Sequence, residues 1–235
     1  MQYSGQRIHP RERLDCAIEL LSGVRVVADV GCDHGRLSCA LVQRKVAERC
    51  IAIDISEPSL KKAERLICRI GLQDRIETRL GDGLSPLAAG EADALAILGM
   101  GGTLMTEILD VQPPLKGAVK CVLQPMRGAE GIRRWLFERN YPVLGDRVVL
   151  DAGRYYQVFS VGQPQRESQS LPLGWPADCF LLGYTAFQER EPLMKPLAER
   201  MLATTRRKLK TQRADALLQQ AAQLEQILAN WENEP

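Results

Sequence analysis

The sequence lacks any long hydrophobic run, and this absence narrows the class of protein. Among its 235 residues, no stretch approaches the roughly 20 apolar residues that a membrane-spanning helix needs. Residues 1–10 are polar and contain no apolar signal-peptide core. Hydrophobic residues make up 45% and charged residues 26%, which is ordinary for a soluble globular chain. We therefore expect a cytoplasmic protein.

Cysteine pairs and histidine clusters are also missing. The seven cysteines are odd in number, scattered, and contain no CxxC pair, so neither a disulfide framework nor a structural zinc site is expected. Of only two histidines, His34 adjoins Cys32 and Asp33. Three neighbouring residues in one turn cannot all converge on one ion. We expect no metal and interpret His34 as a residue that shapes a pocket.

The chain has little net charge, but its basic residues are unevenly distributed. A formal net charge of +2 gives no general indication of nucleic-acid binding. Residues 195–213, however, contain seven basic residues and the single acid Glu199. Such a run is either a solvated helix face or a surface that contacts RNA phosphates. The candidate RNA-binding residues are Arg206, Arg207, Lys208, Lys210 and Arg213.

What the sequence does contain is an alternation of strand-like and helix-like segments. Strand-like runs predict five strands, at residues 24–30, 50–54, 76–80, 92–98 and 118–123. Helical spacing predicts a leading helix and four further helices, at 11–21, 37–46, 58–70, 103–109 and 131–139. This alternation predicts βαβ crossovers and a parallel sheet that is covered on both faces.

The sheet is predicted to finish in an antiparallel hairpin. The strand-like runs 142–150 and 155–161 are separated by only four residues, DAGR, which is too short for a crossover helix. Five parallel strands followed by a hairpin are typical of class I methyltransferases and differ from a symmetric dinucleotide fold. We therefore interpret residues 1–165 as a Rossmann-like α/β catalytic domain.

A second, helical unit is predicted after a linker. Residues 162–176 are rich in Gln, Ser and Pro, which indicates a domain boundary. Residues 191–231 contain no glycine and carry two apolar stripes at helical spacing. We interpret residues 177–235 as a C-terminal domain of two antiparallel, coiled-coil-like helices.

The most informative motif is VVADVGCDHGRL at residues 26–37, where an apolar run ends in an acid and turns into a helical segment. Gly31 and Gly35 enclose three residues and no lysine follows, unlike a phosphate-binding loop or a dinucleotide turn. Asp29 and Asp33 would repel a pyrophosphate. A cationic, phosphate-free nucleoside fits better, and S-adenosylmethionine is the common one.

Acidic residues at later strand ends extend this candidate cofactor site. Asp54 ends the second predicted strand and could accept hydrogen bonds from ribose hydroxyls, because Ser56 is available to cap the next helix. Asp82 follows the third strand and could accept from the cofactor adenine amine, or stabilise a turn instead. The candidate cofactor-binding residues are Asp29, Gly31, Asp33, His34, Asp54, Asp82, Gly83 and Gly99.

Two further segments are candidates for the methyl-transfer site. In GMGG at residues 99–102, the glycines allow close backbone approach, and Met100 could pack against the target base or the cofactor. Gln124 precedes Pro125 at the end of the fifth predicted strand, where it could contact the target base, although the proline also acts as a strand terminator. The candidate catalytic residues are Met100, Gly101, Gln124 and Pro125.

Together these segments resemble the bacterial tRNA adenine-N1 methyltransferase family that modifies adenosine 22. The resemblance rests on RL at 13–14, DVGCDH at 29–34, AID at 52–54, RLGDGL at 79–84, GMGG at 99–102 and LQP at 123–125. It implies a Rossmann-like domain with a C-terminal helical hairpin, S-adenosylmethionine as cofactor and tRNA as partner. It also implies that the target base is unstacked and that the lone pair of adenine N1, which needs no general base, attacks the methyl carbon on the sulfonium in line. The N1–C bond forms as the C–S bond breaks, and the sulfur leaves as a neutral thioether.

The chain departs from the family pattern at one substrate-side position. Met126 stands where the family usually has Asn after Gln-Pro, and Cys32 replaces a common Ser. The alternatives are an RNA-binding protein that resembles a methyltransferase but lacks the activity, or a methyltransferase for another base or a small molecule. The basic residues of 195–213 disfavour the small-molecule alternative. We expect a monomer.

Overall fold

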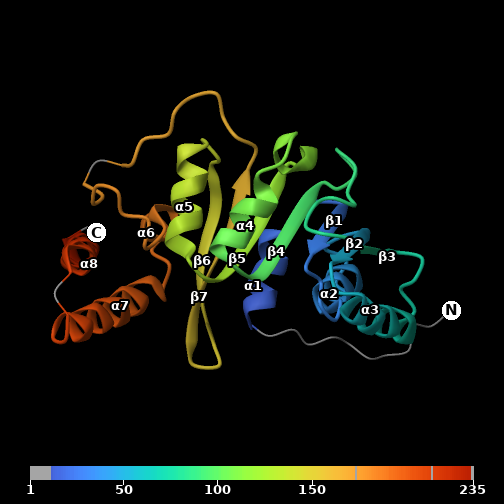
Figure 1. The fold of residues 1–235 in the computed structure, drawn as a ribbon, viewed down its shortest axis with the longest axis horizontal. Coiled ribbons are helices and arrows are strands. Elements are labelled where there is room, and N and C mark those ends of the chain that lie inside the picture. The colour runs from blue at the N-terminus through green and yellow to red at the C-terminus, as the bar shows by residue number, and fades with distance from the viewer. Residues whose placement is uncertain (1–11, 173, 213, 234–235) are drawn as a thin grey trace.

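The computed structural model describes residues 12–172, 174–212 and 214–233. Its centre is a seven-stranded sheet with the order β3-β2-β1-β4-β5-β7-β6 (Figure 1). The strands are β1 (Val26–Val30), β2 (Arg49–Asp54), β3 (Ile76–Leu80), β4 (Ala94–Gly101), β5 (Lys120–Arg127), β6 (Val143–Asp151) and β7 (Arg154–Gly162). Strands β1 to β5 are parallel, and β7 pairs antiparallel with both β5 and β6. The Rossmann-like methyltransferase fold predicted from the sequence is confirmed.

Helices cover both faces of this sheet. They are α1 (Glu12–Leu20), α2 (Arg36–Gln43), α3 (Glu57–Ile70), α4 (Gly102–Leu109), a short 3-10 helix η1 (Pro114–Gly117) and α5 (Ala129–Glu138). The predicted cap of α3 is present, because the Ser56 hydroxyl accepts a hydrogen bond from the backbone of Ser59 at 3.4 Å. The helix ends at Gly71, which adopts a left-handed conformation with φ 72°.

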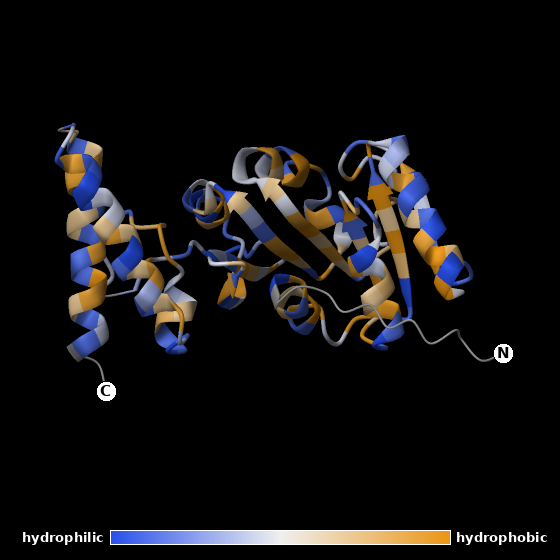
Figure 2. Cartoon of the chain, turned by 90° about the horizontal axis from the view of Figure 1, so that it is seen from below, coloured by the Kyte–Doolittle hydropathy of each residue, from blue (hydrophilic) through white to orange (hydrophobic). Residues whose placement is uncertain are grey.

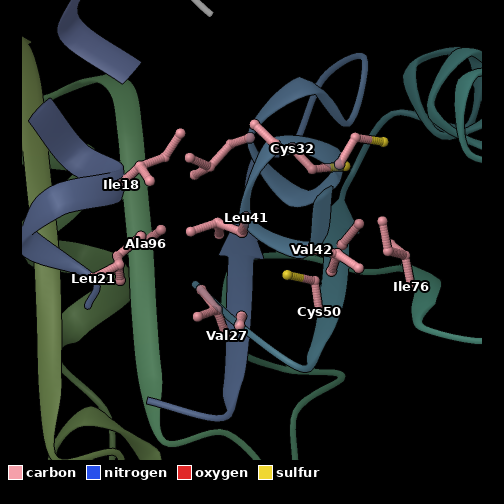
Figure 3. Close-up of a cluster of buried hydrophobic side chains, with 14 of the residues drawn as sticks. Ile18, Leu21, Val27, Cys32, Leu41, Val42, Cys50, Ile76 and Ala96 are labelled. Atoms are coloured by element: carbon pink, nitrogen blue, oxygen red, sulfur yellow. The ribbon is translucent and has the colours of Figure 1, made fainter. Parts of the chain in front are cut away.

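Two hydrophobic cores separate these helices from the sheet. Side chains of α1, α2 and α3 pack on one face, and Figure 3 shows Ile18, Leu21 and Leu41 meeting Val27 and Ala96 of the strands. Side chains of α4 and α5 pack on the other face. Parallel strands that are buried on both faces read as continuous apolar runs, which is why the sequence pattern located them.

A third core holds the C-terminal unit together. It contains α6 (Tyr184–Gln188), α7 (Met194–Leu209) and α8 (Asp215–Asn233), the last two packed as a pair at one end of the molecule (Figure 2). Trp175 is buried in this core, and so is Val148 of β6, which joins the unit to the sheet. Helix α6 has only five residues, too few for a periodic pattern to predict it.

The turn between β6 and β7 extends beyond the sheet on the side where the parallel strands end. Because β6 and β5 are both antiparallel to β7, β6 runs in the same direction as β5. Leu123 of β5 pairs with Phe159 of β7, which in turn pairs with Asp146 of β6. Asp151, at the end of β6, therefore lies five residues beyond the level of Leu123. At about 3.3 Å per residue, the turn lies roughly 16 Å beyond the level of Leu123. Figure 1 shows this hairpin projecting from the sheet.

In the described part of the chain, no helix is long and apolar enough to cross a membrane.

Candidate active site

A cavity of about 720 Å³ opens where the parallel strands end. Its walls come from the C-terminal parts of β1, β2, β4 and β5, from the segments that follow β1 to β4, and from Arg13 and Leu14 of α1. All eight candidate cofactor-binding residues line it, as do Met100 and Gln124. The other two candidate catalytic residues, Gly101 and Pro125, are not among the lining residues. Residues scattered over a hundred positions are therefore brought together because each lies in or after the C-terminal part of a strand of the same sheet.

Asp29, at the end of β1, is the most deeply buried acid of the cavity. One carboxylate oxygen accepts hydrogen bonds from the backbone and the hydroxyl of Ser38, at 3.2 and 2.7 Å. These bonds tie β1 to α2. Burial raises the pKa of Asp29 to about 6, and the hydrogen bonds from Ser38 oppose that rise. The side chain is therefore fixed in place and titrates close to neutral pH.

Asp54 fixes the turn that carries Asp33 and His34. Its two carboxylate oxygens accept hydrogen bonds from the backbone N–H groups of Asp33 and Ser56, at 2.9 and 2.8 Å. Asp33 has a positive φ of 48°, which an Asp tolerates better than most residues. Its carboxylate lies 2.5 Å from Nδ1 of His34. The structure therefore places His34 in the cavity wall beside an acid, and no metal-binding cluster occurs among the residues that it describes.

Asp82 follows β3, on the same side of the cavity as Asp54, and is exposed. Its backbone carbonyl accepts from the N–H of Ser85 at 3.0 Å, so the turn is closed without the carboxylate. Within the described residues, no hydrogen bond or ion pair uses the Asp82 side chain. Gly83 has a positive φ of 52°. The carboxylate of Asp82 is therefore available to a ligand.

The GMGG segment is shaped by packing as well as by the cavity. A Cβ on Gly102 would overlap the carbonyl group of Gly128, so this glycine lets α4 approach the segment after β5. Gly99 adopts a positive φ of 77° and lines the cavity. Met100 points across the cavity toward β1, because a Cβ on Gly31 would overlap its terminal methyl group. Gly101 is the one glycine of this segment that neither close packing nor a positive φ requires.

Gln124, within β5, is only 2% exposed and still lines the cavity. Its side-chain nitrogen donates to the carbonyl of Pro125 at 3.0 Å and lies 3.8 Å from Sδ of Met126. Within the described residues, its side-chain oxygen has no hydrogen-bond partner. The interpretation of Pro125 as a strand terminator is wrong, because β5 continues to Arg127 and pairs Pro125 with Met100.

Arg13 is a cavity residue that sequence reasoning did not select as a site residue. It contacts Met126 across 113 positions of sequence, with Nη1 3.3 Å from Sδ. No local pattern around Arg13 indicates this contact, because it arises only when α1 packs against β5, β6 and β7. The charges of the cavity are consequently divided. The four acids lie on the side of β1 to β3, together with a single cation, Arg36 at the start of α2, whereas Arg13 lies on the side of β5.

The predicted RNA-binding residues of the C-terminal unit lie on α7 and just after it. Arg207, Lys208 and Lys210 are exposed, whereas Arg206 is paired with Glu225 of α8 at 2.8 Å. Arg213 lies outside the described residues. Lys208 also lines a second cavity of about 440 Å³, which α7 forms with the β6–β7 turn. Arg154 and Arg200 line it too, and Arg200 donates to the carbonyl of Gly153 at 3.1 Å.

A parallel sheet that ends in an antiparallel hairpin, with acids following its first three strands, defines a class I methyltransferase architecture. The comparison with known families agrees. The chain belongs to the methyltransferase domain family, which matches residues 11–159.

Particular relatives are also recognisable. The tRNA (adenine(22)-N(1))-methyltransferase of Bacillus subtilis (strain 168) is 34% identical over 158 residues, which make up 67% of this chain and 66% of the relative, just under two thirds of its length. The crystal structure of the B. subtilis m1A22 tRNA methyltransferase TrmK is 27% identical, with a TM-score of 0.77, and the match covers 96% of this chain and 98% of that one. The Mycoplasma capricolum TrmK, solved with S-adenosylhomocysteine, is 21% identical with a TM-score of 0.79 over 96% and 99% of the two chains, and shares the fold.

Proposed function

We propose that this chain is an S-adenosylmethionine-dependent methyltransferase that modifies N1 of adenosine 22 in tRNA. The observation that carries the proposal is the convergence of four acids in one cavity, Asp29, Asp33, Asp54 and Asp82, beside the buried amide of Gln124. The 34% identity to the B. subtilis enzyme, whose name specifies this reaction, supports the choice of substrate.

The residues of the cavity fit the proposed cofactor. A carboxylate offers about four acceptor sites, and Asp54 uses two of them for backbone N–H groups, so it can still accept from ribose hydroxyls. Asp82 has a free carboxylate for the adenine amine, and Asp29 provides negative charge at the base of the cavity. These acids favour a cationic ligand and disfavour a pyrophosphate. When bound, S-adenosylmethionine supplies a methyl group on a positively charged sulfur.

The chain's own contribution to the reaction is orientation and exclusion of water. Neutral adenine already carries a lone pair on N1, so no side chain has to remove a proton before methyl transfer. The free side-chain oxygen of Gln124 can accept a hydrogen bond from the adenine N6 amine and so hold the ring in one orientation. Met100 provides an apolar wall between the two halves of the cavity.

A methylation assay tests this function and its alternatives. The protein is incubated with S-adenosylmethionine and unmodified tRNA, and the nucleosides are analysed by mass spectrometry, with reverse-transcription stops to locate the base. We expect 1-methyladenosine at position 22. A different methylated nucleoside would assign another base, and a protein that binds tRNA and cofactor without any product would be a binding protein. Methylation of small molecules alone would exclude the RNA substrate.

The raised pKa of Asp29 predicts how cofactor binding depends on pH. A protonated carboxyl cannot attract a cationic ligand, and Asp29 is protonated below about pH 6. With one proton taken up on cofactor release, the affinity for S-adenosylmethionine is expected to be about tenfold lower at pH 5 than at pH 7. Isothermal titration calorimetry at pH values between 5 and 7 measures this affinity. The Asp29→Asn variant should bind weakly at both values, and an equally steep dependence in that variant would refute the assignment.

The exposed cations of α7 provide a separate test of tRNA binding. If Arg207, Lys208 and Lys210 contact phosphates, replacing all three with Gln should weaken tRNA binding and reduce the slope of log K against log salt by about 2–3. The affinity for the cofactor should stay unchanged. The matched control replaces Lys61, Lys62 and Arg65, which are exposed on α3 at the other end of the molecule (Figure 1). Equal losses in both triple variants would indicate an effect of net charge alone.

A further inference from the structure

Arg13 is held between the cavity and the β6–β7 hairpin by three groups. Nη1 lies 3.3 Å from Sδ of Met126, and the guanidinium carbon lies 5.4 Å from the centre of the Tyr156 ring. Nε lies 3.6 Å from a carboxylate oxygen of Asp151. These partners belong to β5, β7 and β6, so the position of the guanidinium is set by three strands, and its side chain remains 23% exposed.

These contacts leave most of the hydrogen-bonding capacity of Arg13 unused. A guanidinium has five N–H donors, and a thioether sulfur is a weak acceptor. Among the residues that the structure describes, no oxygen accepts a hydrogen bond from Arg13, and its Nε is buried without a hydrogen-bond partner. Asp151 is close enough for an ion pair but not for a hydrogen bond. A positioned guanidinium with free donors favours a bidentate oxyanion.

The position of Arg13 in the cavity indicates which molecule would bring that anion. Asp29, Asp54 and Asp82 make the side of β1 to β3 negative, which suits the cationic cofactor. Arg13 lies on the other side, with Gln124 and Met126, where the proposed function places the methyl acceptor. In RNA the oxyanions are the phosphates. The carboxylate of the cofactor is the other oxyanion, and the affinity of an Arg13 variant for S-adenosylmethionine distinguishes the two.

The movement of positive charge during the reaction favours a position of Arg13 beside the RNA backbone over one against the target base. Methylation at N1 moves a positive charge from the sulfonium to the adenine ring. A guanidinium against that ring would oppose the transfer, whereas one at a flanking phosphate would not. When a base is unstacked into a cavity, its flanking phosphates stay at the mouth.

We propose that Arg13 binds a phosphate next to the target nucleotide at the mouth of the cavity and positions that nucleotide for methylation. This inference rests on the proposed function. Asp151 and Tyr156 orient the guanidinium, so α1 and the hairpin both contribute to substrate binding.

The test compares Arg13→Gln, Arg13→Lys and the control Arg25→Gln. Arg25 is an exposed arginine paired with Glu48 just before β1, at the edge of the sheet opposite the cavity. Arg13→Gln is expected to weaken tRNA binding roughly tenfold to hundredfold and to reduce the salt slope by about 1, with the affinity for S-adenosylmethionine unchanged. Arg13→Lys should keep the slope and recover part of the affinity. Arg25→Gln should behave as the wild type.

Modified RNA then locates the contact. A methylphosphonate at one phosphate beside the methylated nucleotide removes its charge, so it should weaken binding by the wild type but not by Arg13→Gln. A merely structural role for Arg13 would lower affinity equally at every salt concentration, and an unchanged slope in Arg13→Gln would overturn the proposal. Failure of the proposed function shows separately, as a wild-type protein that binds tRNA with this Arg13 dependence but forms no 1-methyladenosine.

Discussion

Replacing Asp146 with alanine is expected to lower the free energy of unfolding by about 3–5 kcal/mol. Asp146 is 1% exposed and the side chain of Arg133 is 5% exposed. The two form a bidentate ion pair with N–O distances of 2.6 and 2.9 Å. Arg133 also donates to Gln157 at 2.9 Å and lies over the ring of Phe159. Removing the carboxylate would leave a buried cation without its counter-charge. Urea denaturation at pH 7 measures the loss.

Two comparisons distinguish the loss of this buried ion pair from the loss of an exposed one. Arg25 and Glu48 form an exposed pair, so Glu48→Ala is expected to cost less than about 1 kcal/mol. The double variant Arg133→Met/Asp146→Leu removes both charges and should recover most of the stability. If Asp146→Ala were no more damaging than Glu48→Ala, the buried pair would not hold the structure in the way described.

The location of this pair explains why its loss should affect more than one region. Arg133 belongs to α5 and Asp146 to β6, so the pair joins a helix to the last strand of the sheet. Gly183, just before α6, passes so close that a Cβ there would overlap the Asp146 carboxylate. The third hydrophobic core, to which α7 and α8 contribute, lies next to Gly183. We therefore expect the catalytic and C-terminal units to lose stability together.

The sequence predicted the sheet well because its central strands β1, β2, β4 and β5 are largely buried and its turns are short. The five parallel strands, the hairpin and their order along the chain follow from the strand-like runs and the segments between them. The ends of β4 and β5 do not. Both strands continue past the glycine and the proline that were expected to end them, because Met100 pairs with Pro125 after an irregularity in register. Pairing across a bulge depends on the neighbouring strand, which a single-strand pattern cannot show.

The candidate site was predictable to the extent that it follows strand ends. Asp29, Asp54 and Asp82 meet in one cavity because consecutive parallel strands finish at one edge. Arg13 could not be placed in this way, since its contacts join α1 to residues more than a hundred positions later. The close approach of Gly102 to Gly128 is likewise a consequence of helix packing. Roles that depend on long-range packing are the ones that require the structure.

Replacing Asp54 with alanine is expected to lower the affinity for S-adenosylmethionine by roughly tenfold to hundredfold. Hydrogen bonds to a charged group contribute about 1.5–3 kcal/mol, which corresponds to that range. Isothermal titration calorimetry measures the affinity at pH 7. The same variant should also lose stability, because the N–H groups of Asp33 and Ser56 would lose their acceptor. Loss of binding alone would therefore not distinguish a ligand contact from a disturbed turn.

Asp93 provides the matched control for Asp54. Its carboxylate also accepts hydrogen bonds from two backbone N–H groups, those of Arg25 and Val26, both at 2.9 Å. It directly precedes β4, however, beside the beginning of β1 and on the edge of the sheet away from the cavity. Asp93→Ala is expected to reduce stability by a similar amount and leave cofactor affinity unchanged. If Asp93→Ala also weakened cofactor binding, or if folded Asp54→Ala bound as the wild type does, Asp54 would be a structural acid and the ribose would have to be bound elsewhere in the cavity.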